Sequence, residues 1–177
     1  GPFLTVAGVS RNGFASFDLT NGLITPWSPI ALVRGKVSAM VATEGKVYIG
    51  GNFTFGTSFP AAWLAKMDGT TGQLETWAPG LRSSVNTLAI VGANLLVGGE
   101  FNAVNLNTEQ HYLTQYDLST GLAVPWTTGN YPDGPVDALA VQGSTIYAAG
   151  RFNLAGGQVR HGLVALNVSD GTASEWA

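Results

Sequence analysis

Hydrophobic and polar positions alternate along this chain in short segments and do not follow a helical period. Three such segments are 85–90, 95–99 and 113–117, which are rich in β-branched or aromatic residues and are bounded by Gly, Asn, Asp or Ser. Segments with this length, composition and boundary predict β-strands. No segment carries an apolar stripe with helical spacing over ten residues. The pattern therefore predicts an all-β protein.

The predicted strands recur with a period near 50 residues. Four tryptophans mark the repeat at spacings of 50, 49 and 50 residues, and a Gly stands five residues before each of them. Four residues before each Gly is an Asp or an Asn. The repeat positions are Trp27, Trp77, Trp126 and Trp176; Gly22, Gly72, Gly121 and Gly171; and Asp18, Asp68, Asp117 and Asn167. A four-stranded antiparallel unit of about 50 residues is typical of a β-propeller blade.

Each repeat position has an expected structural role. The turn Asp accepts hydrogen bonds from downstream backbone N–H groups, and the turn Gly adopts a positive φ. We expect the Trp to pack between adjacent blades, with its indole N–H bonded to a backbone acceptor. Pro26 and Pro125 precede two of the tryptophans. Because Pro has no N–H to donate to a neighbouring strand, these residues predict that the fourth strand lies at the outer edge of the blade.

The complete pattern resembles the kelch-like propellers. It combines Gly-Gly-x-Phe, Leu-x-x-x-Asp-x-x-Thr-Gly, a Trp and Val-x-x-Leu-Ala, and it is most similar to the Delta-60-type repeats of secreted and surface proteins. The stretch from the turn Asp to the Trp also resembles the tryptophan-docking motif of quinoprotein propellers. This resemblance covers essentially the whole chain, with departures at Asn167 and at Ala148-Ala149. It implies a propeller but no single function, because propellers serve many unrelated tasks.

The phase of the repeat predicts about 3.5 blades and 14 strands. The expected units span approximately 1–36, which is half a blade, 37–84, 85–135 and 136–177. Closed propellers have about 4–8 blades. Three arrangements would complete a ring: further blades of a longer natural chain, a second copy of this chain, or closure of this chain alone as a small ring with one half blade.

Composition excludes several classes of function. Charged residues make up 11% and hydrophobic residues 45%, which excludes disorder. No apolar run approaches the ~20 residues of a membrane-spanning helix. We therefore expect no membrane insertion, and because the eight basic residues are scattered we expect no nucleic-acid binding. The chain has no Cys and no hydrolase, zinc-protease or phosphate-loop motif, so we predict no enzyme activity, no cofactor and no metal.

The long loops predict a binding surface. In an antiparallel blade the 1–2 and 3–4 connections share one face, and here they are tight hairpins. The 2–3 and 4–1 connections share the other face and are long, as in 102–112 and 127–135. Long loops on a rigid scaffold are where function usually resides. The main binding candidates on this loop face are Trp63, His111, Tyr112, Tyr131, Arg160 and His161, with Arg11, Phe55, Phe59, Glu109 and Asp133 beside them.

Each candidate also has a structural interpretation. The loop aromatics either stack on a sugar or a partner's apolar group, or they anchor the loops. His111 and His161 occupy equivalent positions on neighbouring blades, where they either share a metal or remain solvated or bonded to the backbone. Asp133 and Asp137 flank a Pro and are either calcium ligands or solvated loop residues.

The first functional hypothesis is a non-catalytic binding or structural module of a secreted or cell-surface protein, presenting its 2–3 and 4–1 loops to a protein or a glycan. The low charge and the many Gly, Thr, Ser and Asn residues agree with an extracellular location. The alternatives are a lectin-like sugar-binding propeller and a fragment of a propeller enzyme whose site is completed elsewhere. The expected partner is a protein, a glycan or a second copy that completes the ring.

Overall fold

The computed structural model describes residues 3–11, 13–29, 33–55, 62–105, 110–126 and 129–176. The strands are β1 (Thr5–Val6), β2 (Val9–Ser10), β3 (Val33–Thr43), β4 (Lys46–Phe55), β5 (Ala62–Asp68), β6 (Val85–Val91), β7 (Asn94–Gly99), β8 (Leu113–Asp117), β9 (Val136–Gln142), β10 (Thr145–Gly150), β11 (Leu154–Ala155), β12 (Gln158–Val159) and β13 (Leu163–Asn167). These ranges contain strands and no helix, and so none that would cross a membrane.

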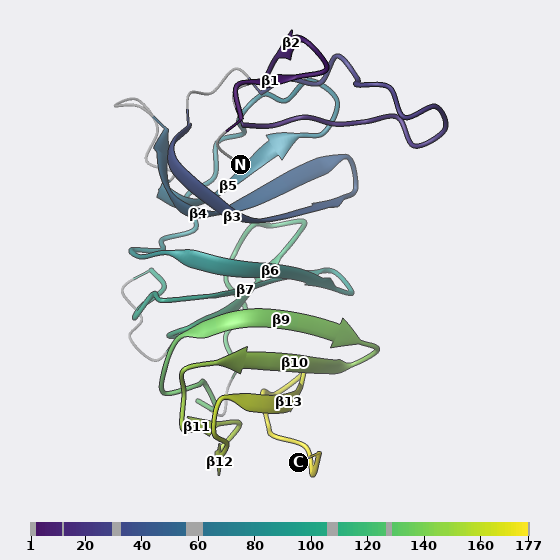
Figure 1. Cartoon of the computed structure of the whole chain (residues 1–177). Coiled ribbons are helices and arrows are strands. Elements are labelled where there is room, and N and C mark those ends of the chain that lie inside the picture. Colours follow the sequence, from purple (N-terminus) through teal and green to yellow (C-terminus); the bar gives the residue numbers. More distant parts are fainter. Residues whose placement is uncertain are drawn as a thin grey trace.

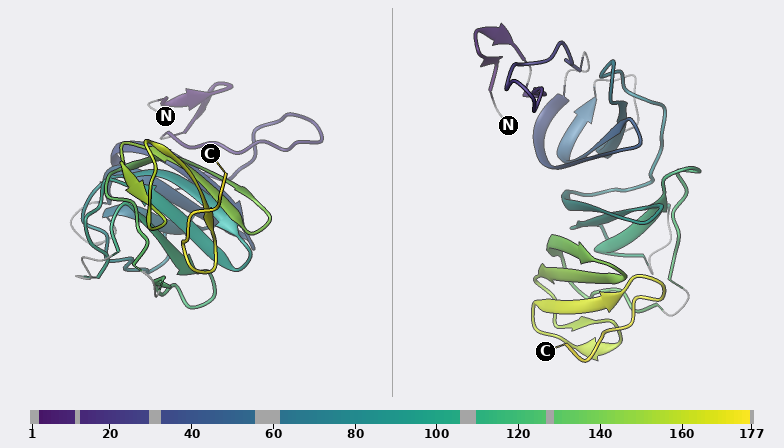
Figure 2. Two further views of the ribbon diagram at one scale, coloured as in Figure 1. Left: turned by 90° about the horizontal axis from the view of Figure 1, so that it is seen from below. Right: turned by 90° about the vertical axis from the view of Figure 1, so that its right-hand side faces the viewer.

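Three antiparallel sheets follow one another along the chain as layers (Figure 1). Their strand orders are β3-β4-β5, β6-β7-β8 and β9-β10-β13. The first strands of neighbouring sheets pack together, β3 against β6 and β6 against β9. Strands β1 and β2 lie at one end of the stack and β13 at the other (Figures 1 and 2). Successive sheets of this kind are blades, which confirms the predicted all-β propeller class.

The fourth strand of each unit is reduced to one β-bridge. The bridges are Phe17–Ile24, Met67–Leu74, Tyr116–Ala123 and Leu166–Ala173. Backbone bonds flank each bridge; for example, Val124 N donates to Gln115 O at 2.8 Å. The pairing ends there because Pro125 has no N–H to donate and the chain then turns Trp126 toward the next blade. The outer strand predicted from the sequence is thus present in its shortest form.

Two of the long 2–3 connections contain a small hairpin. The hairpins β1–β2 and β11–β12 are equivalent, with Thr5 opposite Ser10 and Leu154 opposite Val159. Each has a two-residue turn whose residues both have positive φ. The turn residues are Ala7 (48°), Gly8 (76°), Gly156 (62°) and Gly157 (76°). This conformation matches the twist of the flanking strands.

The core lies between consecutive blades. Of three clusters of buried side chains, one includes Trp27 and one includes Trp126, while the partly buried Trp77 packs against the third. The first Gly of the Gly-Gly pair allows blades to approach closely. A Cβ on Gly98 would lie 2.8 Å from Val136 Cγ1 of the next blade, and one on Gly50 would overlap Val85. The first Gly of the pair therefore allows the close distance between blades.

Candidate functional site

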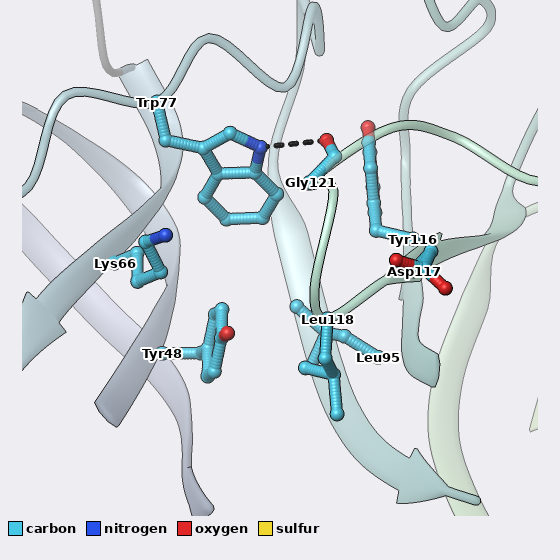
Figure 3. A pocket seen from close by; sticks show the side chains of 8 residues that line it. All are labelled: Tyr48, Lys66, Trp77, Leu95, Tyr116, Asp117, Leu118 and Gly121. Atoms are coloured by element: carbon cyan, nitrogen blue, oxygen red, sulfur yellow. Dashed lines mark hydrogen bonds between the residues drawn. The ribbon is translucent and has the colours of Figure 1, made fainter. Parts of the chain in front are cut away.

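Tryptophan docking joins the blades, as the spacing predicts. The indole N–H of Trp27 donates to the carbonyl of Asp68 at 3.3 Å, that of Trp77 to Gly121 at 2.8 Å, and that of Trp126 to Val168 at 2.9 Å. Each acceptor lies in the 3–4 turn of the following unit, and Figure 3 shows the middle junction. The fourth repeat tryptophan, Trp176, is 45% exposed and contacts Tyr147 of its own blade edge-on.

The turn carboxylates have the expected role. Asp68 Oδ1 accepts the N–H groups of Thr70 and Thr71, and Asp117 Oδ1 accepts those of Ser119 and Thr120. The Thr71 N–H is the main cause that lowers the pKa of Asp68, to about 2. The Ser119 hydroxyl is the main cause that lowers the pKa of Asp117, to about 2. The turn glycines of the four units have φ between 71° and 73°.

A small cavity lies beside the Trp77 junction (Figure 3). It is lined by Tyr48, Lys66, Trp77, Leu95, Tyr116, Asp117, Leu118 and Gly121. The space open to the centre of a water molecule is about 10 Å³, which is the room needed by one water at most. This cavity is therefore part of the blade packing and is too small for a ligand.

Three of the predicted binding residues come together on the loop face. The ring centroids of His111 and Tyr112 lie 5.3 Å apart, those of His111 and Tyr131 6.1 Å apart, and Tyr131 stacks on Trp126 at 5.2 Å. We call His111, Tyr112, Trp126 and Tyr131 the aromatic cluster. Trp126 and Tyr131 are buried, whereas His111 and Tyr112 are half-buried and reach the surface. The cluster is thus a surface with a rigid aromatic base.

The Tyr131 hydroxyl fixes this base. It accepts the backbone N–H of Trp126 at 2.8 Å, and the buried Gln110 Nε2 lies 3.5 Å from it. Tyr131 belongs to the 4–1 connection, whereas His111 and Tyr112 end the 2–3 connection before β8. Because Trp126 also docks on the next blade, the cluster is tied to the rigid junction between two blades.

Tyr112 and Trp63 have an unusual backbone. Tyr112 directly precedes β8 and Trp63 is the second residue of β5, and both have positive φ, 62° for Tyr112 and 77° for Trp63. The equivalent residues of the other units are Gly13 (83°) and Gly162 (77°). A non-glycine residue in this region costs roughly 1–2 kcal/mol. Sequence reasoning named both aromatics but missed the strain, although alignment of the units places Gly at the other two positions.

The local bonding explains why the strained conformation is required. Tyr112 N donates to Phe101 O at 2.8 Å, and Gly99 N donates to Tyr112 O at 2.9 Å. Gly162 makes the same two bonds, to Phe152 and from Gly150, both at 2.9 Å. The chain must turn here to bring β8 back alongside β7. Tyr112 adopts the positive φ that this turn requires, although its side chain disfavours it.

Arg160, predicted as a binding residue, bonds within its own blade. Its Nη2 donates to Ser174 O at 3.0 Å and its Nη1 to Val159 O at 3.2 Å. Arg11 makes the equivalent bonds, with Nη2 2.7 Å from Thr25 O. Both arginines tie a loop hairpin to the outer strand. This shared role was missed in the sequence, although the two residues are equivalent in the repeat.

The remaining predicted residues have separate surroundings. His161 is exposed, with Nδ1 3.3 Å from Asn153 Oδ1. Trp63 is half-buried against the cluster around Trp77. Phe59 and Glu109 lie outside the described residues, and of Phe55 only the backbone is described. In the described ranges no group of three or more His, Asp or Glu side chains is arranged to hold a metal ion.

Asp133 joins the loops beside the aromatic cluster. Its Oδ1 accepts the N–H groups of Asn153 and Leu154 at 2.7 and 2.9 Å. The Leu154 N–H is the largest of the causes that lower the pKa of Asp133, and the charge of His111 contributes. Asp133 therefore has a bonded role in the fold that neither sequence interpretation, calcium ligand or solvated residue, included.

A charged network that sequence reasoning missed joins two neighbouring blades. Arg151 Nη2 lies 2.6 Å from Glu100 Oε1, and its Nε lies 3.2 Å from Asp137 Oδ2. Asn86 Nδ2 donates to Asp137 Oδ1 at 3.0 Å. Glu100 and Arg151 each precede the repeat Phe, so the units place them at equivalent positions. Opposite charges at equivalent positions of neighbouring units were the sequence signal that could have revealed this network.

These features define a β-propeller built from tryptophan-docked blades, a class that serves as binding or structural modules. Residues 14–174 match the family described as the Rax2 C-terminal beta propeller domain. The match covers most of the 177 residues, and the chain belongs to this family. A search of curated proteins found no match.

A solved structure of a designed protein, Ika4, shares the fold. The computationally designed Ika4 protein is 15% identical, with a TM-score of 0.52, and the match covers 80% of this chain and 72% of that one. The computationally designed Ika8 protein is 16% identical with a TM-score of 0.49, and the match covers 77% of this chain and 35% of that one. The chain thus spans about a third of the length of Ika8.

Proposed function

We propose that this domain is a non-catalytic binding module of a secreted or cell-surface protein, and that its loop face recognises a protein or a glycan. The observation that carries the proposal is the aromatic cluster, in which a strained Tyr112 is held beside His111 at the surface. The Gly-Gly-x-Phe and Asp-x-x-Thr-Gly patterns support a relationship to the kelch-like and Delta-60-type repeats of secreted proteins.

Backbone strain in a bulky residue supports a functional role. Strained residues persist where the surrounding structure imposes them, and they concentrate at functional sites. At this position two other units use Gly, so the fold itself does not need an aromatic residue there. Tyr112 adds a half-buried ring to the loop face, and this ring is the feature that a ligand would use.

The cluster also suits recognition because it is already ordered. His111 contacts both Tyr112 and Tyr131, and Tyr131 is stacked on the docked Trp126. A surface that is rigid before binding loses little conformational entropy when it binds. Aromatic rings supply large contact area with few rotatable bonds.

Sugar binding is the second candidate function. The observation that favours it is the exposed Asp133, which lies two residues after Tyr131 in the same 4–1 connection. Ligand sites combine apolar and aromatic surface with a few polar groups that fix orientation. A ring face bordered by an acceptor is a suitable surface for a sugar.

The test is a binding screen against a glycan array and against a displayed library of extracellular protein fragments. The wild-type domain is compared with Tyr112→Gly and His111→Ala, and the control is Leu122→Ser, which alters an exposed residue next to the 3–4 turn on the opposite face. A ligand retained by Leu122→Ser and lost by both cluster variants supports the proposal. A ligand that all variants bind equally contradicts it, and hits confined to glycans favour the lectin alternative.

A further inference from the structure

The 3–4 turn of the last unit differs from the others at its first residue, where Asn167 replaces the repeat Asp. Asn167 Oδ1 accepts the N–H of Ser169 at 3.0 Å and the hydroxyl of Ser169 at 2.9 Å. Asp117 Oδ1 accepts the corresponding groups of Ser119 at 3.0 and 2.6 Å. Asn167 therefore stabilises its turn with the oxygen of its side chain, as the repeat Asp does.

The amide nitrogen of Asn167 has no part in the turn. Because the Ser169 N–H is a donor, the oxygen must be the side-chain atom that faces it, which leaves Nδ2 on the other side. Within the described ranges Nδ2 donates no hydrogen bond, and the Asn167 residue is exposed. An amide nitrogen that is accessible and free of structural bonds is available for modification.

The residues around this nitrogen form an acceptor sequence. Asn167, Val168 and Ser169 match Asn-x-Ser, in which the middle residue is not Pro and which accepts N-linked glycans. The other three turns also have Ser or Thr at the third position, but their Asp has no amide nitrogen to modify. Replacing Asp by Asn at this one turn thus creates the acceptor sequence without losing the bonds of the turn.

A second Asn-x-Ser/Thr sequence, at 52–54, has a different setting. Asn52 lies within β4, and the next residue, Phe53, is buried. The equivalent residues of the following units are Glu100 and Arg151, whose side chains form an ion pair between neighbouring blades. Asn52 therefore belongs to a row of positions along which blades contact each other. A bulky glycan suits the exposed turn better than this row.

The turn position stays accessible when another blade follows. The side chain of Asp68, which is equivalent to Asn167, is 32% exposed although the sheet β6-β7-β8 follows its own blade. The preceding blade contacts the turn through other residues, since Trp126 Nε1 donates to Val168 O at 2.9 Å and a Cβ on Gly171 would overlap the Trp126 ring. The accessibility of Asn167 is therefore a property of the repeat position.

We propose that Asn167 is an N-glycosylation site, an inference that rests on the proposed place of this domain in a secreted or cell-surface protein. Asn167 Nδ2 forms a bond to C1 of the first sugar of a lipid-linked oligosaccharide diphosphate. The bond from C1 to the diphosphate oxygen breaks, the lipid diphosphate leaves, and Nδ2 loses one proton. The sugar donor and its transferase belong to the secretory pathway. Because Oδ1 is unchanged, the glycan leaves the hydrogen bonds of the turn intact.

The glycan would lie on the face opposite the aromatic cluster. Asn167 begins a 3–4 turn, whereas Tyr112 ends a 2–3 connection and Tyr131 belongs to a 4–1 connection. In an antiparallel blade these two kinds of connection lie at opposite ends of the strands. A glycan at Asn167 therefore adds a bulky, polar group to the hairpin face and leaves the loop face free to bind.

The test is to express the domain behind an added signal peptide in cells that perform N-glycosylation, and to recover it from both the medium and the secretory compartments. Enzymatic removal of the glycan in water that contains heavy oxygen converts a glycosylated Asn into an isotope-labelled Asp, which mass spectrometry of peptides locates. We expect most molecules to carry the label at position 167. An unlabelled Asn167 in protein that has entered the secretory pathway overturns the inference.

Two variants provide matched controls. Asn167→Asp restores the residue of the other three turns, so it should lose the label at position 167 and keep the urea midpoint of the wild type. Ser169→Thr keeps the acceptor sequence, and Thr20 and Thr70 occupy this position in two other units, so it should keep the label. Loss of the label in Ser169→Thr, or a lower urea midpoint for the glycosylated than for the deglycosylated wild type, would contradict the inference.

Ligand binding separates this inference from the proposed function. Glycosylated wild type and Asn167→Asp should bind a loop-face ligand equally, because the glycan lies on the opposite face. Labelled protein that binds no ligand would contradict the proposed recognition role alone. Unlabelled protein that binds through the aromatic cluster would contradict the glycosylation site alone.

Discussion

The docking of Trp126 makes a quantitative prediction about Gly171. Gly171 and Gly45 have the same φ of 72°, but a Cβ on Gly171 would overlap the Trp126 ring, whereas one on Gly45 would meet nothing within 4 Å. Alanine at either position adds the cost of a left-handed backbone, roughly 1–2 kcal/mol. Only at Gly171 does it also overpack the junction, which costs about 1–3 kcal/mol more. Gly171→Ala is therefore predicted to be the more destabilising of the two.

Urea unfolding of the two variants, followed by tryptophan fluorescence, measures the difference. With a slope of roughly 2 kcal/mol per molar urea, the Gly171→Ala midpoint should lie about 0.5–1.5 M below that of Gly45→Ala. Because the backbone cost is common to both variants, it cancels from the comparison. Equal midpoints would show that Trp126 does not press on this turn, and the docking account of the junction would then be wrong.

Three further predictions concern the same framework. Trp77→Phe removes the hydrogen bond to Gly121 and should lower the free energy of unfolding by about 1 kcal/mol or more, seen as a lower melting temperature. Asp68 and Asp117 have folded pKa values of about 2, below the unfolded value of about 3.9. The stability that they contribute is therefore present above pH 4 and is lost as the pH falls toward 2. Replacing both by Asn should reduce the change of the urea midpoint with pH between pH 4 and pH 2. Arg151→Ala should lower the urea midpoint only slightly, because its ion pairs are exposed, and the difference should shrink in high salt.

The repeat made most of the fold predictable. A Trp five residues after a Gly, recurring near every 50 residues, was enough to predict blades, the turn role of Asp and Gly, and tryptophan docking. These features depend on local sequence and on contacts that every unit repeats. The hairpins β1–β2 and β11–β12 were missed, although Gly156-Gly157 between short apolar segments is a turn signal.

The candidate site was predictable only in part. Sequence reasoning selected His111, Tyr112 and Tyr131, which come together, but it also selected Arg160, whose side chain bonds to its own blade. It missed the network of Arg151, although Glu100 and Arg151 occupy equivalent repeat positions, because contact between such residues depends on the angle at which two sheets pack.

The most direct test of the account is to measure ligand binding and stability together in Tyr112→Gly. Replacing the ring relieves roughly 1–2 kcal/mol of backbone strain and loses a similar amount of packing. If Tyr112 serves recognition, its free energy of unfolding should stay within about 1 kcal/mol of the wild type while binding to the ligand identified for the loop face is lost. Unchanged binding, or a loss of binding that only follows a loss of stability, would contradict the claim that this face is the recognition surface.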